Sequence, residues 1–99
     1  MSGISDFLIR LSSFIPRHER VAFLQSVVET CGSIYKASKE LGISRAQIYR
    51  YLARSPRRNY PSDEVMARIL AASLRLRPAW TRDRLRFLAK SFSDMVRYL

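Results

Sequence analysis

Residues 34–52 read IYKASKELGISRAQIYRYL, and this stretch decides the fold. Its helical pattern breaks at Leu41-Gly42-Ile43-Ser44. Gly42 can end the first helix, because a left-handed residue after a helix end costs glycine little. The Ser44 hydroxyl can then accept a hydrogen bond from a free amide of the next turn. We therefore expect two short helices joined by a tight turn, with the small Ser38 letting them cross closely. Their apolar positions are Ile34, Ala37, Leu41, Ile43, Ile48 and Tyr51.

The second helix of this pair leaves four polar side chains outside, namely Arg45, Gln47, Tyr49 and Arg50. Each of them can hydrogen-bond to bases or phosphates; arginine suits guanine and glutamine suits adenine. A small residue, a glycine, a cap and apolar positions in register are typical of a helix-turn-helix, here residues 33–52. The alternative is a helical hairpin that packs a core or binds protein. That alternative gives the four exposed side chains no role.

The net charge agrees with a nucleic-acid partner. The chain has 18 Lys+Arg against 8 Asp+Glu, a formal net charge of +10 in 99 residues. Such an excess attracts polyanions, of which nucleic acid is the commonest. Fifteen of the 18 are arginine, whose planar fork grips phosphate or guanine with two bonds. Genome base composition can also enrich arginine, so the enrichment alone carries little weight.

Length and composition predict a single domain, residues 1–99, with one small core. No apolar run approaches the roughly 20 residues of a membrane helix, and the N-terminus lacks the basic start of a signal peptide. We therefore expect a cytoplasmic, nucleoid-associated protein with no membrane partner. Cys31 is the only cysteine and His18 the only histidine. They suggest no catalytic set, metal, cofactor or small-molecule ligand, so we do not expect an enzyme.

Strand patterns are nearly absent, and the expected fold is all-α with five to six helices around the helix-turn-helix. A first amphipathic helix is expected over 4–15, capped by Ser5 or Asp6 and ended by Pro16. Its apolar stripe would be Ile4, Phe7, Leu8, Leu11 and Ile15. Further helices are expected over 17–31, from Ser62 or Asp63 to about Arg75, and over 81–98, with Thr81 as the cap of the last.

The last helix carries an apolar seam at spacings of 3, 4, 3 and 4, made of Leu85, Leu88, Phe92, Met95 and Leu99. Such a heptad seam is typical of helices that pair with each other. It predicts a homodimer built by the terminal helices. The alternative is that the last helix folds back on the domain and the first packs over it, closing one core.

Residues 33–52 resemble the helix-turn-helix of prokaryotic regulators. The sequence GSIYKASKELGISRAQIYRYL is similar to that of the trihelical Fis and resolvase type. The later YPSDEVMARILAAS is similar to the helix after the loop in Cro/repressor-like domains, which a Pro-Ser-x-Glu sequence often opens. The resemblance covers about half of the chain and leaves both subfamilies open.

The resemblance implies that the helix from Ser44 enters the major groove, with Ser44, Arg45, Gln47, Tyr49 and Arg50 facing base edges and flanking phosphates. The amides near Ser33 would meet a phosphate, and Lys36 would add charge there. The following basic loop, with Arg54, Arg57, Arg58 and Asn59, would lie along phosphates or in a minor groove. Its alternative role is that of a solvated loop.

These observations predict a sequence-specific double-stranded DNA-binding protein, a transcriptional regulator acting as a homodimer. A two-fold dimer would space its half-sites about one DNA turn apart. One alternative is an architectural or recombination-associated binder of low sequence specificity. Another is a protein-interaction module, or the DNA-binding part of a larger protein such as a recombinase.

Overall fold

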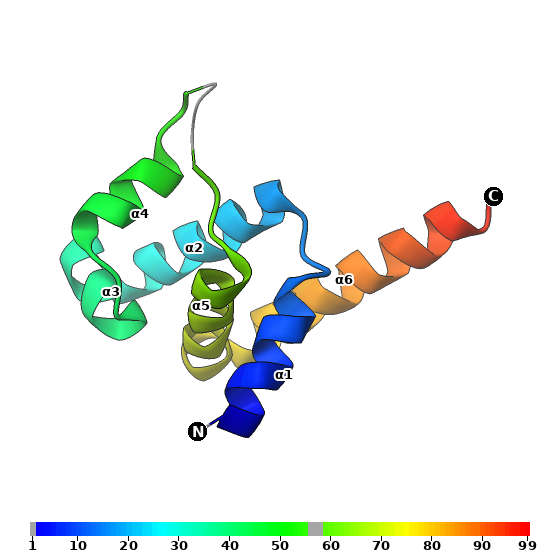
Figure 1. Cartoon of the computed structure of the whole chain (residues 1–99), viewed down its shortest axis with the longest axis horizontal. Helices are drawn as coiled ribbons and strands as arrows, with labels where there is room; N and C mark the ends of the chain where they lie inside the picture. Colours follow the sequence, from blue (N-terminus) through cyan, green and yellow to red (C-terminus); the bar gives the residue numbers. More distant parts are fainter. Residues whose placement is uncertain (1, 56–58) are drawn as a thin grey trace.

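The computed structural model describes residues 2–55 and 59–99, and all regular secondary structure among them is helical. This confirms the predicted all-α class with five to six helices. Two helices form the N-terminal part and two the C-terminal part, with a short pair between them (Figure 1). They are α1 (Ser2–Ser12), α2 (Arg17–Cys31), α3 (Ile34–Leu41), α4 (Arg45–Leu52), α5 (Asp63–Leu76) and α6 (Pro78–Val96).

Helix α5 is the centre of the fold, because it packs against α1, α2, α3 and α6. Its Met66, Ile69 and Leu70 are fully buried. They share one core with Phe23 of α2 and Ile48 of α4, which are also fully buried. Burying each such side chain stabilises the fold by about 1.5–3 kcal/mol. Helix α2 packs against both α3 and α4, and α5 packs against α3, so these two helices together hold the α3–α4 pair in place.

Local capping signals set most of the helix boundaries. Gly32 and Gly42 end α2 and α3 in the left-handed conformation, with φ of 93° and 68°. Ser33, Ser44 and Ser62 each accept a hydrogen bond from the backbone amide three residues later. The predicted limits of the central helices are therefore confirmed to within a residue or two.

The prediction for the first helix was wrong in its limits. The helix spans Ser2–Ser12, so neither Ser5 nor Asp6 caps it and it ends before Pro16. Phe7 is also 62% exposed rather than inward. The physical reason for the early end is Arg20 of α2, whose guanidinium donates to the carbonyls of Ser12 (2.7 Å) and Ile15 (2.8 Å). These bonds satisfy carbonyls that a longer helix would have used itself.

The last helix also begins earlier than predicted. It starts at Pro78, a residue favoured at a first helical position, and Thr81 is buried inside it rather than capping it. The Thr81 hydroxyl lies 2.5 Å from the Ser73 hydroxyl and 3.0 Å from the Ser73 carbonyl oxygen. Trp80 packs edge-to-face on Phe23 with ring centroids 5.4 Å apart. Both contacts fix the start of α6 to the body.

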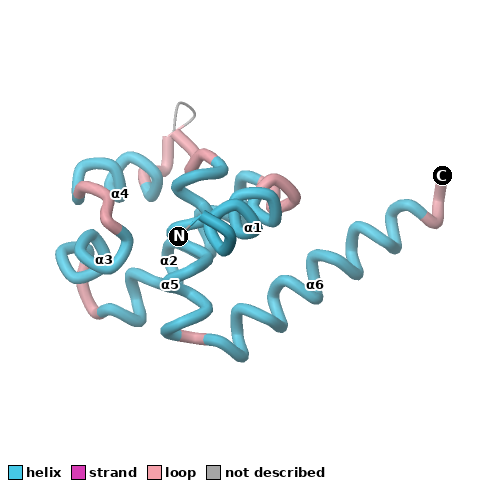
Figure 2. Tube along the Cα trace, turned by 60° about the horizontal axis from the view of Figure 1, so that its bottom comes forward, coloured by secondary structure: helices cyan, strands magenta, loops and turns pink. Residues whose placement is uncertain are grey.

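The C-terminal half of α6 projects away from the other helices (Figure 2). The helix packs against α5 near its start, and Arg84 ties it to Glu19 of α2 through two hydrogen bonds of 2.8 and 2.5 Å. It ends at Val96, short of the predicted residue 98. Leu85 and Leu88 of α6 are partly buried against the core, so the first part of the helix packs on the domain, whereas its C-terminal half does not.

Candidate nucleic-acid interface

The turn between α3 and α4 is fixed from both sides. Inside the pair, the Ser38 hydroxyl donates to the carbonyl of Ile43 at 2.5 Å. From α5, Arg68 Nη1 donates to the carbonyl of Gly42 at 3.0 Å. A Cβ atom on Gly42 would lie 2.8 Å from that same Nη1. These contacts set the angle at which α4 leaves the turn, and so the direction of its outer face.

The start of α4 is closed by a reciprocal pair of hydrogen bonds, a capping box. Ser44 Oγ accepts from the Gln47 amide at 3.1 Å, and Gln47 Oε1 accepts from the Ser44 amide at 3.4 Å. Gln47 Nε2 also lies 3.5 Å from the Tyr51 hydroxyl. Reading adenine takes both the oxygen and the nitrogen of the glutamine amide. In this geometry the Gln47 amide contacts the helix end through its oxygen and Tyr51 through its nitrogen, so neither atom is directed to a base alone.

The outer face of α4 consists of Arg45, Tyr49 and Arg50, all exposed, Tyr49 by 61% of its surface. Ile48 and Tyr51 of the same helix are buried, as expected. The eight residues of α4 extend over about 12 Å. A helix with its side chains is about 10–12 Å in diameter, which fits the major groove of B-DNA, about 12 Å wide.

Arg45 belongs to a small cluster that joins α3 to α4. Its guanidinium carbon lies 5.6 Å from the ring centroid of Tyr35, and Lys39 Nζ lies 4.8 Å from the same centroid. Tyr35 remains 52% exposed. We call these three residues the Tyr35 cluster. Sequence reasoning missed Tyr35 and Lys39, although their spacing of four residues puts them on one side of α3.

The start of α3 lies on a polar surface as well. Ser33 Oγ accepts from the Lys36 amide at 3.1 Å, so the Ser33 hydroxyl caps the helix. The Lys36 side chain is exposed. The first amides of a helix have no acceptor within it, and they favour a negative group in front of them. Ser33 and Lys36 therefore both lie at the start of α3, where Ser33 caps the helix and Lys36 exposes its side chain.

The basic loop is described only in part. Arg54 and Asn59 are exposed, whereas Arg57 and Arg58 lie outside the described residues. Next to the loop end, Tyr60 packs edge-to-face on His18 (5.6 Å), and Arg17 lies 5.7 Å from the Tyr60 ring centroid. Arg17 and His18, at the start of α2, thus lie beside the loop, and neither was predicted there from the sequence.

Three arginines that tie helices of the body together have carboxylate partners. Arg20 pairs with Asp63 at 2.8 Å, Arg75 pairs with Glu40, and Arg84 pairs with Glu19. The bond to Glu19 raises the pKa of Arg84. Within residues 2–55 and 59–99, the salt bridges include neither Arg45 nor Arg50 nor Arg54. The exposed cations of the candidate interface are therefore available to an external anion, and they are Lys36, Arg45, Arg50 and Arg54.

The described part of the chain gives little support for a metal site, a membrane-spanning helix or a reactive thiol. Its His, Cys, Asp and Glu residues form no group of three or more that could hold a metal ion. None of its helices combines the length and the apolar character needed to cross a membrane. Cys31 is partly rather than fully buried, and burial raises the pKa of its thiol. A thiol with a raised pKa is a poor nucleophile at neutral pH.

Comparisons with protein-family models, with curated proteins and with solved structures find no match to this chain. The features that bear on function are therefore the geometry of α3 and α4 and the charges that these helices expose.

Proposed function

We propose that this chain is a sequence-specific double-stranded DNA-binding protein that reads the major groove with α4 and regulates transcription as a homodimer. The observation that carries the proposal is the contrast between its arginines. Arg20, Arg75 and Arg84, which tie helices of the body together, are paired with carboxylates, whereas Arg45 and Arg50 of α4 are exposed and outside every salt bridge of the described residues. An exposed arginine without a carboxylate partner suits guanine or phosphate.

Two further features support this role. Gly42 and Ser44 close a rigid turn and cap, so α4 is held at a fixed angle to α3. The resemblance of residues 33–52 to the helix-turn-helix of prokaryotic regulators implies the same use of the second helix. The proposal places the protein in the cytoplasm, associated with the nucleoid.

A second candidate function is DNA binding with little sequence preference, as in an architectural or recombination-associated protein. The engagement of Gln47 in the capping box favours it, because this side chain then offers no complete adenine-reading pair. The net charge of +10 also favours it, since contacts to phosphates carry no sequence information.

Selection from a pool of random DNA duplexes separates the two candidates. A defined motif among the bound duplexes would support the regulator, and bound duplexes without a common motif would support the architectural protein. Arg45→Ala, Arg50→Ala and their combination provide the test of the interface. Arg82→Ala is a matched control, because Arg82 is an exposed arginine on α6 that takes part in no salt bridge among the described residues. Failure of the parent protein to bind any duplex at low salt would overturn both candidates.

A further inference from the structure

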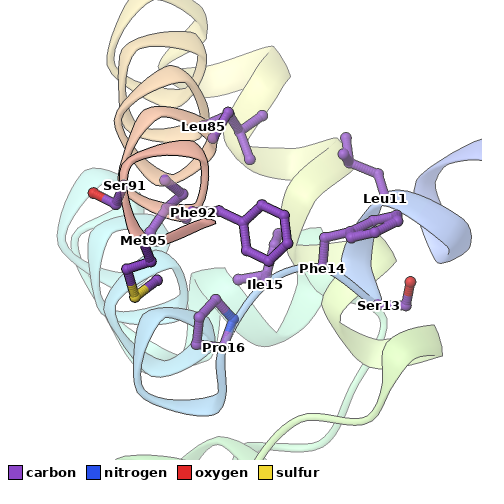
Figure 3. A pocket seen from close by; sticks show the side chains of 11 residues that line it. Leu11, Ser13, Phe14, Ile15, Pro16, Leu85, Ser91, Phe92 and Met95 are labelled. Carbon is purple, nitrogen blue, oxygen red and sulfur yellow. The ribbon is translucent and has the colours of Figure 1, made fainter. Parts of the chain in front are cut away.

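An apolar groove opens between the C-terminal half of α6 and the turn that joins α1 to α2 (Figure 3). Its volume is about 600 Å³. Phe92 of α6 and Phe14 of the turn both point into it. The main apolar side chains around it are Leu11, Phe14, Ile15, Leu88, Phe92 and Met95. The groove is thus built by the two terminal segments and lies apart from α3 and α4.

The groove, together with the end of the chain that follows Met95, exposes more apolar surface than a monomer of this kind usually tolerates. Phe14 is 76% exposed, Phe92 and Met95 are 64% exposed, and Val96 and Leu99 are exposed by 48% and 104%. These five side chains offer roughly 700 Å² if a fully exposed large side chain presents about 200 Å². The largest apolar patch of a typical monomer covers about 300–600 Å². The surface is therefore suited to a partner.

We infer that the occupant of the groove is the α6 helix of a second copy of this chain. A two-fold interface uses the same patch on both subunits, so the patch must be complementary to itself. Here α6 supplies one wall of the groove with Leu88, Phe92 and Met95. Its C-terminal half projects away from the other helices (Figure 2), so a second copy can reach the same face. Two antiparallel α6 helices would bring the two copies of Phe92 close to the two-fold axis, because Phe92 is the middle residue of the seam.

The available area agrees with a stable dimer. Two such patches together bury roughly 1,400 Å², within the range of about 1,200–2,000 Å² of specific protein interfaces. The structure divides the apolar seam predicted for the last helix into two parts. Leu85 and Leu88 are already partly buried against the monomer core, whereas Phe92, Met95 and Leu99 are exposed. The interface consists of Phe92, Met95 and Leu99 together with Phe14, which the sequence pattern did not include.

The experiment is equilibrium sedimentation of the full chain, with circular dichroism as a check of folding. The parent is expected to be a dimer at micromolar concentrations. Phe92→Asp places a charge at the centre of the interface and is expected to weaken dimerisation about 100-fold or more. Ser93→Asp is the matched control: it adds the same charge to an exposed neighbour on α6 that does not line the groove, and it should leave the dimer intact.

A parent protein that stays monomeric throughout would overturn the inference, as would equal effects of the two variants. If Phe92→Asp unfolds, Phe14→Asp replaces it, because Phe14 lies in an exposed turn between helices. Unfolding of both variants would place the groove in the monomer core and would also overturn the inference. The result is independent of DNA binding: a monomer that binds duplexes retains the proposed function, and a dimer that binds none retains this interface.

Discussion

Arg45 on α4 lies over the ring of Tyr35 on α3, with its guanidinium carbon 5.6 Å from the ring centroid. The ring faces two cations, since Lys39 approaches it at 4.8 Å. A cation over an aromatic ring is stabilised by about 0.5–1 kcal/mol at an exposed site. The interaction restricts the rotamers of Arg45 before any ligand arrives. Under the proposed function, Tyr35 is the residue that positions the Arg45 side chain at the start of α4.

Tyr35→Ala should weaken binding to a selected duplex by about 0.5–1 kcal/mol, because Arg45 loses the ring that orients it. Tyr35→Phe keeps the ring and should bind like the parent. Fluorescence anisotropy with a labelled duplex measures both. An equal loss in the two variants would show that the hydroxyl, rather than the ring, makes the contribution.

Gln47 is expected to affect stability more than base reading. Gln47→Ala removes one half of the capping box and should lower the free energy of unfolding by about 0.5–1 kcal/mol. Gln47→Glu can keep the box and should keep most of the stability, but its charge should weaken DNA binding. Thermal denaturation and anisotropy together separate the two effects. If Gln47→Ala unfolds like the parent and yet loses sequence preference, Gln47 reads a base.

Gly42→Ala should destabilise the protein more than Gly32→Ala. Both glycines have positive φ, so both substitutions cost about 1–2 kcal/mol of backbone strain. Only at Gly42 does the new Cβ meet another group, Arg68 Nη1 at 2.8 Å, whereas Gly32 has open space around it. Arg68 would have to move and give up its bond to the Gly42 carbonyl, a further loss of about 0.5–1.5 kcal/mol. Urea denaturation measures the difference.

The Arg68→Ala background provides the control for that comparison. Without the Arg68 side chain, the two glycine substitutions should cost the same. A difference that persists in this background would mean that the strain at Gly42 comes from the turn itself.

Local sequence signals account for what could be predicted. Gly42, Ser44 and Ser62 act within one helical turn, so the limits of α3, α4 and α5 follow from the residues beside them. Thr81 has the chemistry of a cap as well. It lies inside α6 because its hydroxyl finds a buried partner in Ser73, and only the packing of α5 on α6 reveals that partner.

The other differences between the sequence predictions and the structure also arise from tertiary contacts. The early end of α1 depends on Arg20, which donates to a carbonyl eight residues earlier. The Tyr35 cluster requires the crossing of α3 and α4, and the wall of the groove at Phe14 requires the α1–α2 turn to face α6. A periodic pattern states which face of a helix is apolar, but it does not state which neighbour covers that face.

The basic loop should contribute affinity without sequence preference. Neutralising Arg54, Arg57 and Arg58 together should weaken binding to every duplex alike. Each lost phosphate contact should reduce the slope of log affinity against log salt by about one. A titration over several salt concentrations measures this, and an unchanged slope would show that these arginines face only solvent.

Arg45 should behave differently from the loop, and this contrast tests the proposed reading of DNA most directly. Arg45 is exposed at the first turn of α4, outside the salt bridges of the described chain, and oriented by Tyr35. Arg45→Ala should therefore cost about 1–3 kcal/mol on a selected duplex if it grips a guanine, and much less on unrelated DNA. Arg82→Ala removes the same charge from α6 and should change neither affinity by a comparable amount. Equal losses for Arg45→Ala on selected and unrelated duplexes would make Arg45 a phosphate contact, and the architectural function would then be the better account of α4.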